Sequence, residues 1–330
     1  MKRAWLLFFF AGLLLLSLSI VTILFFINTP LFAPYSKAKV VIHFNEGMSA
    51  NALVPLLSEQ HTLRSPLYFS LYLRFLASNS RYQAGIYQLP VDITPKQLEL
   101  MLVEGKVLKQ SLTIKEGQTA SDVFKALRQN SLVTPETKIQ LTLLKNCLLC
   151  RHGMEGMFLA DTYFYPAGSN ESALLLRANK ALVEALNRAW FNRQNNLPYK
   201  TPYELLIAAS IVEKETADSL EKNLVSAVIV NRLKKNMRLQ MDPTVIYGLG
   251  ERYVYPLTRK DLRFETKYNT YRNKGLPPTP ICNVGVESLI ATAHPKRVKY
   301  LYFVAKVDGT HQFSETLKQQ INAINRQKKQ

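Results

Sequence analysis

Residues 201–216, TPYELLIAASIVEKET, contain the most informative helix of the chain. They begin with a threonine followed by a proline and, three positions after the threonine, a glutamate. This pattern is a capping box with proline at the first helical position. Residues 205–212 are apolar almost all round, so we expect the helix to be buried inside a globular domain. The helix ends at the two carboxylates of Glu213 and Glu215.

These two acids project from different faces of the predicted helix. At 100° per residue, Glu215 continues the apolar stripe of Ile211 and Val212, whereas Glu213 continues a stripe that includes Ser210. Burial raises a carboxyl pKa towards the range that suits a general acid near neutral pH, so we predict a raised pKa for Glu215. The alternative is that both acids are solvated or are paired with Lys214, Arg232 or Lys222.

Further helices and one hairpin flank this element in the sequence. Residues 170–192 carry apolar side chains at a helical period, which indicates a scaffold helix. A second helix starts at Asp218, with Glu221 three residues on as a capping pair. Near the C-terminus the pattern predicts a strand at 300–307, a tight turn at 308–309, a partner strand at 311–313 and a final polar helix at 314–330.

An internal repeat occupies the first half of the chain. Residues 40–50 align with residues 110–120, and each copy reads as a β-branched strand, a Glu-Gly turn, a Ser or Thr suited to cap a helix, and an amphipathic helix. Between the copies we expect helices at 66–76 and 94–103 and a strand at 85–89. The repeat therefore predicts one α+β module over residues 40–130.

The segment 135–153 is the predicted domain boundary, and it contains Cys147 and Cys150 followed by His152. Two cysteines at this spacing in a turn can form a local disulfide or a redox-labile pair, and the alternative is two buried thiols. A zinc site is disfavoured because there is one nearby histidine and no second ligand pair. Cys282 is left single.

The N-terminus carries a candidate membrane anchor. Ala4–Ile27 has no charged residue and is long enough to span a bilayer, and it follows Lys2 and Arg3. No small-residue cleavage site follows it, so we predict an uncleaved signal anchor rather than a removed signal peptide. Residues 1–3 are then cytoplasmic, 28–39 form a linker and the body lies outside. A buried core helix is the alternative.

Composition and net charge limit the classes of protein and of binding partner that we expect. The chain has 330 residues, 47% of them hydrophobic, so it is neither disordered nor a small disulfide scaffold. Its net charge of +18 favours a polyanionic neighbour. Because the body is expected to be extracytoplasmic, nucleic acid is not a predicted partner, whereas anionic lipid or the carboxylates of peptidoglycan stem peptides are. Serine-hydrolase elbows, zinc-protease motifs, phosphate loops and dinucleotide fingerprints are absent from the sequence.

A set of ordered motifs then points to one family. Polar and aromatic residues at 239–248, 268–271 and 275–278 suit sugar rings, whose faces stack on aromatics and whose rims form hydrogen bonds. Together with Ala209–Thr216, Val230–Leu233, His294–Lys296 and Tyr300–Ala305, they occur in the order seen in the endolytic murein transglycosylase (YceG-like) family. The resemblance covers essentially the whole chain.

This resemblance implies an α+β protein with an N-terminal transmembrane helix at 4–27, a LysM-like module at 40–130 and a catalytic domain at 131–330. It further implies a single-pass enzyme of the bacterial inner membrane with a periplasmic catalytic domain. Such an enzyme is a lytic transglycosylase (EC 4.2.2.-) that cuts nascent peptidoglycan strands internally between MurNAc and GlcNAc. No metal or organic cofactor is implied, and the peptidoglycan synthesis machinery is the implied partner.

The same resemblance assigns the site residues. The catalytic acid falls on Glu215, which agrees with the helix-face argument and would act first as acid and then as base to leave 1,6-anhydroMurNAc ends. Other family blocks match residues expected to line the site, namely Glu213, Asn231, Gln240, Asp242, Thr244, Tyr247 and Asn269. Met241 departs from the family, which more often has a small hydroxyl residue there.

Two rival functions stay open from the sequence. A hydrolase of the same bond would use a second essential acid, for which Glu213 and Asp242 are the candidates. A non-catalytic peptidoglycan-binding scaffold would keep its cellular function when Glu215 is changed to Gln.

Overall fold

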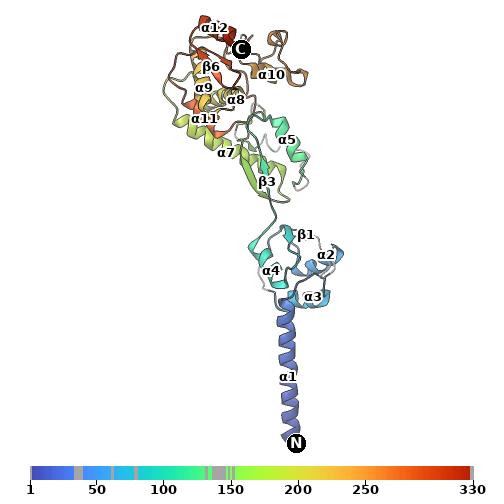
Figure 1. The fold of residues 1–330 in the computed structure, drawn as a ribbon. Coiled ribbons are helices and arrows are strands. Elements are labelled where there is room, and N and C mark those ends of the chain that lie inside the picture. Colours follow the sequence, from blue (N-terminus) through green and yellow to red (C-terminus); the bar gives the residue numbers. More distant parts are fainter. Residues whose placement is uncertain are drawn as a thin grey trace. The chain divides into compact units, whose positions relative to one another are not determined.

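The computed structural model describes residues 2–32, 40–60, 63–77, 81–130, 133–135, 146–147, 149–150 and 153–327, with side chains from residue 9 onward and except that of residue 60. It is a mixed α+β protein that divides into two compact units (Figure 1). The N-terminal unit comprises Met1–Gln110 and Phe164–Gly168, and the C-terminal unit comprises Ser111–Tyr163 and Ser169–Gln330. Three two-stranded sheets lie within the described residues.

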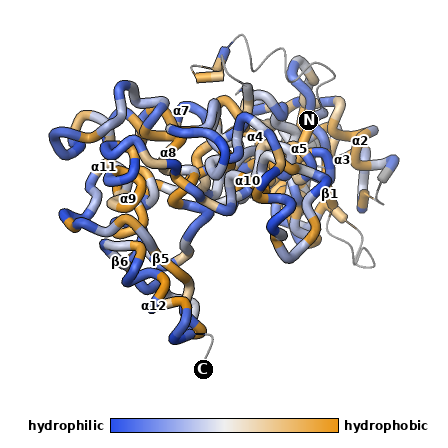
Figure 2. The backbone as a smooth tube through the Cα atoms, turned by 90° about the horizontal axis from the view of Figure 1, so that it is seen from above, coloured by the Kyte–Doolittle hydropathy of each residue, from blue (hydrophilic) through white to orange (hydrophobic). Residues whose placement is uncertain are grey.

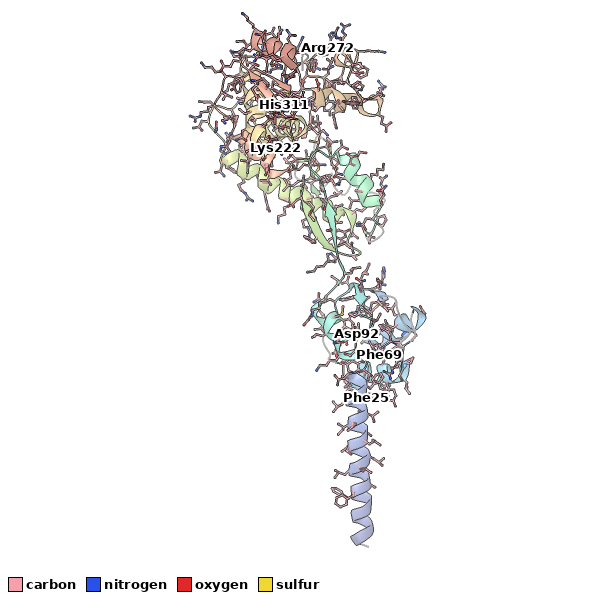
Figure 3. The ribbon with its side chains drawn as sticks, viewed as in Figure 1. Phe25, Phe69, Asp92, Lys222, Arg272 and His311 are labelled. Atoms are coloured by element: carbon pink, nitrogen blue, oxygen red, sulfur yellow. A yellow bond between two sulfur atoms is a disulfide. The ribbon has the colours of Figure 1, made fainter. Side chains whose placement is uncertain are left out.

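The chain begins with α1 (Lys2–Ile27), the one described helix that is long and apolar enough to cross a membrane. Its described side chains are mostly exposed up to Phe25 and project away from the helix axis (Figure 3). Soluble domains rarely leave a helix of this length uncovered and apolar all round, so α1 differs from the alternative of a buried core helix.

The N-terminal unit is built on a small antiparallel sheet. Strand β1 (Val40–Phe44) pairs with β2 (Gly85–Leu89), and Val40 lies opposite Leu89. Helices pack around this sheet, namely η1 (Ala50–Ala52), α2 (Leu53–Gln60), α3 (Pro66–Phe75) and α4 (Pro95–Glu104). The predicted strand at 85–89 and the helices at 66–76 and 94–103 are confirmed. Thr94 and Gln97 form the reciprocal capping box that starts α4.

The segment after α1 is not wholly a linker. Leu31 and Phe32 are buried in the core of the N-terminal unit, and the Leu31 N–H donates to the Ile93 carbonyl at 2.8 Å. The rest of the predicted linker, residues 33–39, lies outside the described residues. The body of this unit therefore starts within a few residues of Ile27.

The two copies of the repeat do not share one compact unit. The second copy forms β3 (Lys109–Thr113) and α5 (Ala120–Arg128), and β3 pairs with β4 (Thr162–Pro166) rather than with the first copy. Its Glu-Gly turn is held by the C-terminal unit, because the Gly117 N–H donates to the Asn283 carbonyl at 3.0 Å. The compact units divide the chain after Gln110, whereas the sequence pattern predicts one module over residues 40–130 and a boundary segment at 135–153.

Part of the predicted boundary segment, 135–153, can be described. Cys147 and Cys150 form a disulfide with Cα atoms 5.5 Å apart, which confirms the local disulfide over two free thiols. His152 and residues 136–145 lie outside the described residues. Cys282 is a free, buried thiol.

The C-terminal unit is a helical assembly with one hairpin. Helix α8 (Pro202–Glu215) contacts four other helices, which are α7 (Glu171–Phe191), α9 (Ser219–Lys234), α10 (Asp242–Leu249) and α11 (Val286–Ala293). Two short helices follow α10, namely η3 (Gly250–Arg252) and η4 (Asp261–Arg263). The predicted hairpin is present as β5 (Tyr302–Ala305) and β6 (His311–Ser314), followed by α12 (Leu317–Gln327).

Hydropathy explains why α8 takes the central place. Hydrophobic and hydrophilic residues alternate along the surrounding helices, which have one buried and one exposed face (Figure 2). In α8, by contrast, every residue from Leu205 to Glu213 is buried. The sequence-based expectation of a buried helix at 201–216 is confirmed, and its last residue, Glu215, is half-buried with its Oε1 atom covered.

Candidate active site

The start and end of α8 are set by side chains near its termini. The Thr201 hydroxyl accepts a hydrogen bond from the Glu204 N–H at 3.2 Å, so half of the predicted capping box is present. The Glu204 carboxylate instead accepts from the Lys200 N–H at 2.6 Å. At the other end Thr216 has extended backbone angles, which stops the helix directly after Glu215.

Glu215 lies at the wall of a cavity of about 260 Å³ within the C-terminal unit. This volume is slightly below the usual range of ligand pockets, about 300–1,000 Å³. The wall also contains residues from α9, from the segment before α10, from β5 and from β6, namely Arg232, Leu239, Gln240, Met241, Asp242, Tyr271, Phe303, Val304, Ala305 and His311.

The carboxyl group of Glu215 is in an environment that favours its neutral form. Its Oε1 atom is buried and has no hydrogen-bond partner among the described residues. Burial raises the pKa of Glu215 to about 8, the negative charge of Asp242 adds to the rise, and the positive charge of Arg232 opposes it. The predicted rise in pKa is confirmed. The protonated form of Glu215 is therefore favoured near neutral pH.

Arg232 holds two parts of the cavity wall together. Its Nε donates to the Leu301 carbonyl and its Nη1 to the Leu239 carbonyl, both at 2.6 Å, and Nη1 also reaches Gln240 Oε1 at 3.3 Å. Burial lowers the pKa of the guanidinium. Through these hydrogen bonds to carbonyl and amide oxygens, Arg232 holds Leu301, the residue before β5, beside the segment that precedes α10.

Asp242 is the first residue of α10 and lies in the same cavity wall as Glu215. Its Oδ1 accepts a hydrogen bond from the Tyr271 hydroxyl at 2.6 Å, and this bond together with burial raises the pKa of that tyrosine. Gln240, two residues earlier, has a φ of 50°, which is rare outside glycine and often marks a functional segment. Its N–H donates to the Thr270 carbonyl at 3.2 Å.

Met241 is buried between these two polar residues. Its N–H donates to Thr270 Oγ1 at 3.0 Å, and its apolar side chain forms part of the cavity wall. A hydroxyl at this position would offer the cavity a polar group that this chain lacks.

His311 is a wall residue that the sequence reasoning places only in a strand. Its Nδ1 lies 2.6 Å from Glu221 Oε2, and its backbone N–H donates to Glu221 Oε1 at 2.8 Å (Figure 3). The ring packs edge-on against Phe303, with the ring centres 5.2 Å apart. No hydrogen bond to His311 Nε2 is present among the described residues.

Of the seven residues predicted to line the site, Gln240 and Asp242 share this cavity with Glu215. Glu213 has other partners: its Oε1 is 3.0 Å from Lys222 Nζ, and its Oε2 accepts from the Gly285 N–H at 2.9 Å. Asn231 donates from its side chain to the carbonyls of Val298 and Tyr300.

The other three predicted residues also bond to protein groups. The Thr244 hydroxyl donates to the Met241 carbonyl at 2.6 Å, and the Asn269 amide donates to the Phe264 carbonyl at 2.6 Å. The Tyr247 hydroxyl donates to Glu155 Oε2 at 3.2 Å. Contact between these residues and a substrate stays a prediction. Arg232 and Tyr271, which belong to the motif blocks 230–233 and 268–271, also lie in the wall, and so does His311, which no motif block includes.

Residues 42–326 match the model of the YceG-like family. The chain belongs to the YceG-like family. The cavity-wall residues described above, from Glu215 to His311, all lie within the matched range.

Similar proteins with recorded names extend this result. The YceG-like chain is 29% identical over 313 residues to the endolytic murein transglycosylase of Bacillus subtilis (strain 168), covering 86% of this chain and 83% of the relative. It is 26% identical over 307 residues to the protein of that name in Streptococcus pneumoniae serotype 2, covering 82% of this chain and 55% of the relative. The chain therefore spans about half of the streptococcal relative's length.

A solved structure shares the fold of this YceG-like chain. The crystal structure of a YceG-like protein from Listeria monocytogenes superimposes with a TM-score of 0.53 at 27% sequence identity. The match covers 87% of this chain and 99% of the Listeria chain.

Proposed function

We propose that this YceG-like chain is an endolytic peptidoglycan lytic transglycosylase, a carbon–oxygen lyase acting on polysaccharide (EC 4.2.2.-). The observation that carries the proposal is Glu215, a carboxyl group with a raised pKa and an unpartnered oxygen at the wall of a cavity. Family membership and the names of the bacterial relatives support the substrate class. A protonated carboxyl is the group that cleavage of a glycosidic bond needs.

Glu215 would act twice in the reaction. It first donates its proton to the glycosidic oxygen between MurNAc and GlcNAc, and the bond from MurNAc C1 to that oxygen breaks. The C6 hydroxyl of the same MurNAc then attacks C1, and its proton returns to the Glu215 carboxylate. No water is consumed, so the new end is 1,6-anhydroMurNAc. A tethered hydroxyl competes well because effective molarities reach about 10⁵ M or more in well-oriented cases.

Asp242 supports this chemistry by its charge. A carboxylate in the same cavity favours the positive charge that develops at C1, and it also raises the pKa of Glu215. The hydrogen bond from Tyr271 holds the Asp242 carboxyl in place. Arg232 holds another part of the cavity wall in place, because its guanidinium donates hydrogen bonds to the carbonyls of both Leu239 and Leu301.

Asp242 also favours a second candidate function, hydrolysis of the same bond. Two carboxyl groups at one cavity are the equipment of ordinary glycosidases, in which the second acid activates a water or forms a covalent intermediate. The two reactions differ in their products, because hydrolysis leaves a reducing MurNAc end that is heavier by one water.

Mass spectrometry of the products from purified glycan strands tests the proposal. We expect the wild-type chain to produce 1,6-anhydroMurNAc ends within the strand. Glu215→Gln should lower the rate by about 10²-fold or more, because the amide cannot donate or take back the proton. The exposed Glu251→Gln is the matched control and should be unaffected.

Two outcomes would reject the proposal. Reducing MurNAc ends from the wild-type chain would favour the hydrolase. Near-normal turnover by Glu215→Gln, with normal retention on glycan strands, would favour a non-catalytic binding scaffold.

The surroundings of the enzyme are part of the proposal. We infer a single-pass anchor at α1, with residues 1–3 cytoplasmic and the catalytic domain (predicted as 131–330) periplasmic or otherwise extracytoplasmic. The LysM-like character of residues 40–130 is supported by the duplicated strand, Glu-Gly turn and helix, and it would assist binding to glycan strands. The peptidoglycan synthesis machinery is the expected protein partner, since it produces the nascent strands.

A further inference from the structure

The surface of α3 carries an apolar face that is largely exposed among the described residues of the N-terminal unit. Leu67, Tyr68, Leu71 and Phe75 are 70%, 47%, 43% and 71% exposed. At 100° per residue these four positions fall on one side of the helix, and we call them the α3 apolar face. The opposite side of α3 is filled separately, because Phe69, Tyr72 and Leu73 are buried in the core of the unit.

This face lies directly against the end of α1. The rings of Tyr68 and Phe26 are 5.0 Å apart, and α3 lies beside the last turns of α1 (Figure 1). A cleft of about 280 Å³ runs between the two helices, and every residue of its wall is aliphatic or aromatic. The residues from α1 are Ile23, Phe26 and Ile27.

The length of α1 fixes the depth of these contacts. Residues 4–27 form about 36 Å of helix, against a hydrocarbon thickness of about 30 Å, so Phe26 and Ile27 reach the boundary between lipid tails and headgroups. The chain then has three residues before Leu31, which is buried in the N-terminal unit. The four Cα–Cα steps from Ile27 to Leu31 span about 14 Å at most, so the unit cannot stand away from the bilayer surface.

We propose that the α3 apolar face inserts into the lipid leaflet on the side of the body, and that an acyl chain occupies the cleft between α1 and α3. Tyr and Phe at this depth match the aromatic belt of membrane proteins. Arg74 lies over the Phe75 ring at 5.6 Å and forms no ion pair within the described part of the chain, so it suits a lipid phosphate. The inference rests on the proposed span of α1.

Depth-dependent quenching in lipid nanodiscs tests the inference with the full-length protein. Trp5 and Trp190 are first replaced by Phe, and a single Trp is then placed at one of three exposed positions. Phe75→Trp reports on the α3 apolar face, and Leu15→Trp reports on the middle of α1. His43→Trp reports on β1, which lies at the opposite end of the unit from α1 (Figure 1).

We expect lipids with brominated acyl chains to quench most of the emission of Phe75→Trp and Leu15→Trp, and to leave His43→Trp unchanged. Quenching of Leu15→Trp without quenching of Phe75→Trp would overturn the inference and leave the anchor intact. A blue-shifted but unquenched Phe75→Trp would show that protein, such as a second copy, covers the face, and would also overturn it. No quenching at Leu15 would reject the span together with the inference, whereas the product assay on Glu215 would be unaffected.

Discussion

Glu213 and Glu215 lie two residues apart on α8 and have opposite surroundings. Glu213 faces the Lys222 ammonium group at 3.0 Å and accepts a hydrogen bond from the Gly285 N–H. Glu215 has one buried oxygen without a partner and a negative neighbour, Asp242. The turn of the helix between them is enough to separate a paired carboxylate from a carboxyl that keeps its proton near neutral pH.

The raised pKa of Glu215 gives a signed prediction for the pH dependence of activity. The proton donor is the neutral form, which dominates below the pKa of about 8 and is lost above it. We therefore expect kcat/KM to fall about tenfold per pH unit above pH 8. Initial rates on purified glycan strands between pH 6 and 10 measure this limb, and a limb near pH 5 would contradict the assignment.

The variant Asp242→Asn tests whether the charge of Asp242 contributes to the raised pKa of Glu215. The variant removes a negative charge that raises the pKa of Glu215, while the attraction to Arg232 remains. We expect the alkaline limb to move to lower pH, whatever happens to the maximal rate. A limb that stays in place would show that Asp242 does not act on Glu215 through its charge.

His311 gives a second prediction at the level of one residue. In His311→Asn the side-chain amide can replace Nδ1 towards Glu221 but has no group at the position of Nε2. If Nε2 contacts the glycan, we expect kcat/KM to fall about 5- to 10-fold, the usual worth of one hydrogen bond. The thermal midpoint of the C-terminal unit should change little. In contrast, a lower thermal midpoint with unchanged kcat/KM would assign His311 a structural role only.

The sequence predicts the surroundings of some residues of the candidate site but not of others. The period of α8 alone indicates that Glu215 has apolar neighbours, because positions three and four apart share a face. Polar residues in downstream motifs are ambiguous, because the groups that suit a sugar also satisfy buried backbone. Thr244 and Asn269 illustrate the second use, whereas Asp242 lies in the cavity wall. The meeting of His311 with Glu221 joins two distant elements, and no local pattern encodes it.

At the scale of elements, a buried ion pair links α8 to α9. Lys222 on α9 lies 3.0 Å from Glu213 on α8 and 3.7 Å from Glu116, which comes from the Glu-Gly turn after β3. Lys222 and Glu213 are almost fully buried (Lys222 is labelled in Figure 3). The pair therefore fixes the last turn of α8, from which Glu215 projects.

We predict that Lys222→Met destabilises the C-terminal unit by about 3–5 kcal/mol, because it leaves the Glu213 carboxylate buried without its counter-charge. The double variant Glu213→Gln/Lys222→Met should recover most of that loss. Urea unfolding followed by the fluorescence of Trp190 on α7 measures the difference. Lys234→Met, an exposed change on the same helix, is the control. Equal stability of the single and double variants would contradict the prediction.

The elements of the repeat were predictable, whereas their grouping was not. Each copy shows the strand, turn and helix that its residues favour, but only the second helix is capped as predicted: Thr119 caps α5 with Asp122, whereas Ser49 forms no side-chain cap before η1. Strand pairing depends on partners elsewhere in the chain, and β3 pairs with β4, about fifty residues later. Sequence similarity between the two copies therefore predicts which helices and strands each copy forms, but it does not predict which compact unit each copy belongs to.

For the whole molecule, the anchor makes a prediction about topology. Lys2 and Arg3 precede α1, and the positive-inside bias predicts that residues 1–3 stay in the cytoplasm. We expect protease added to intact spheroplasts to degrade the body and spare α1. An epitope tag at residue 330 reports the loss. A protected body, or a mature N-terminus near residue 30, would contradict the prediction.

The division of the chain into units bears on how such proteins could evolve. The N-terminal unit takes Phe164–Gly168 from within the sequence of the C-terminal unit, so the two are interleaved along the gene. A single recombination event after codon 110 would replace most of the N-terminal unit by a foreign one. The five residues Phe164–Gly168 would stay in the chain, and they fit the original N-terminal unit, not the foreign one. Exchange of the membrane-proximal unit therefore requires two coordinated changes, and the pair of units should be inherited together.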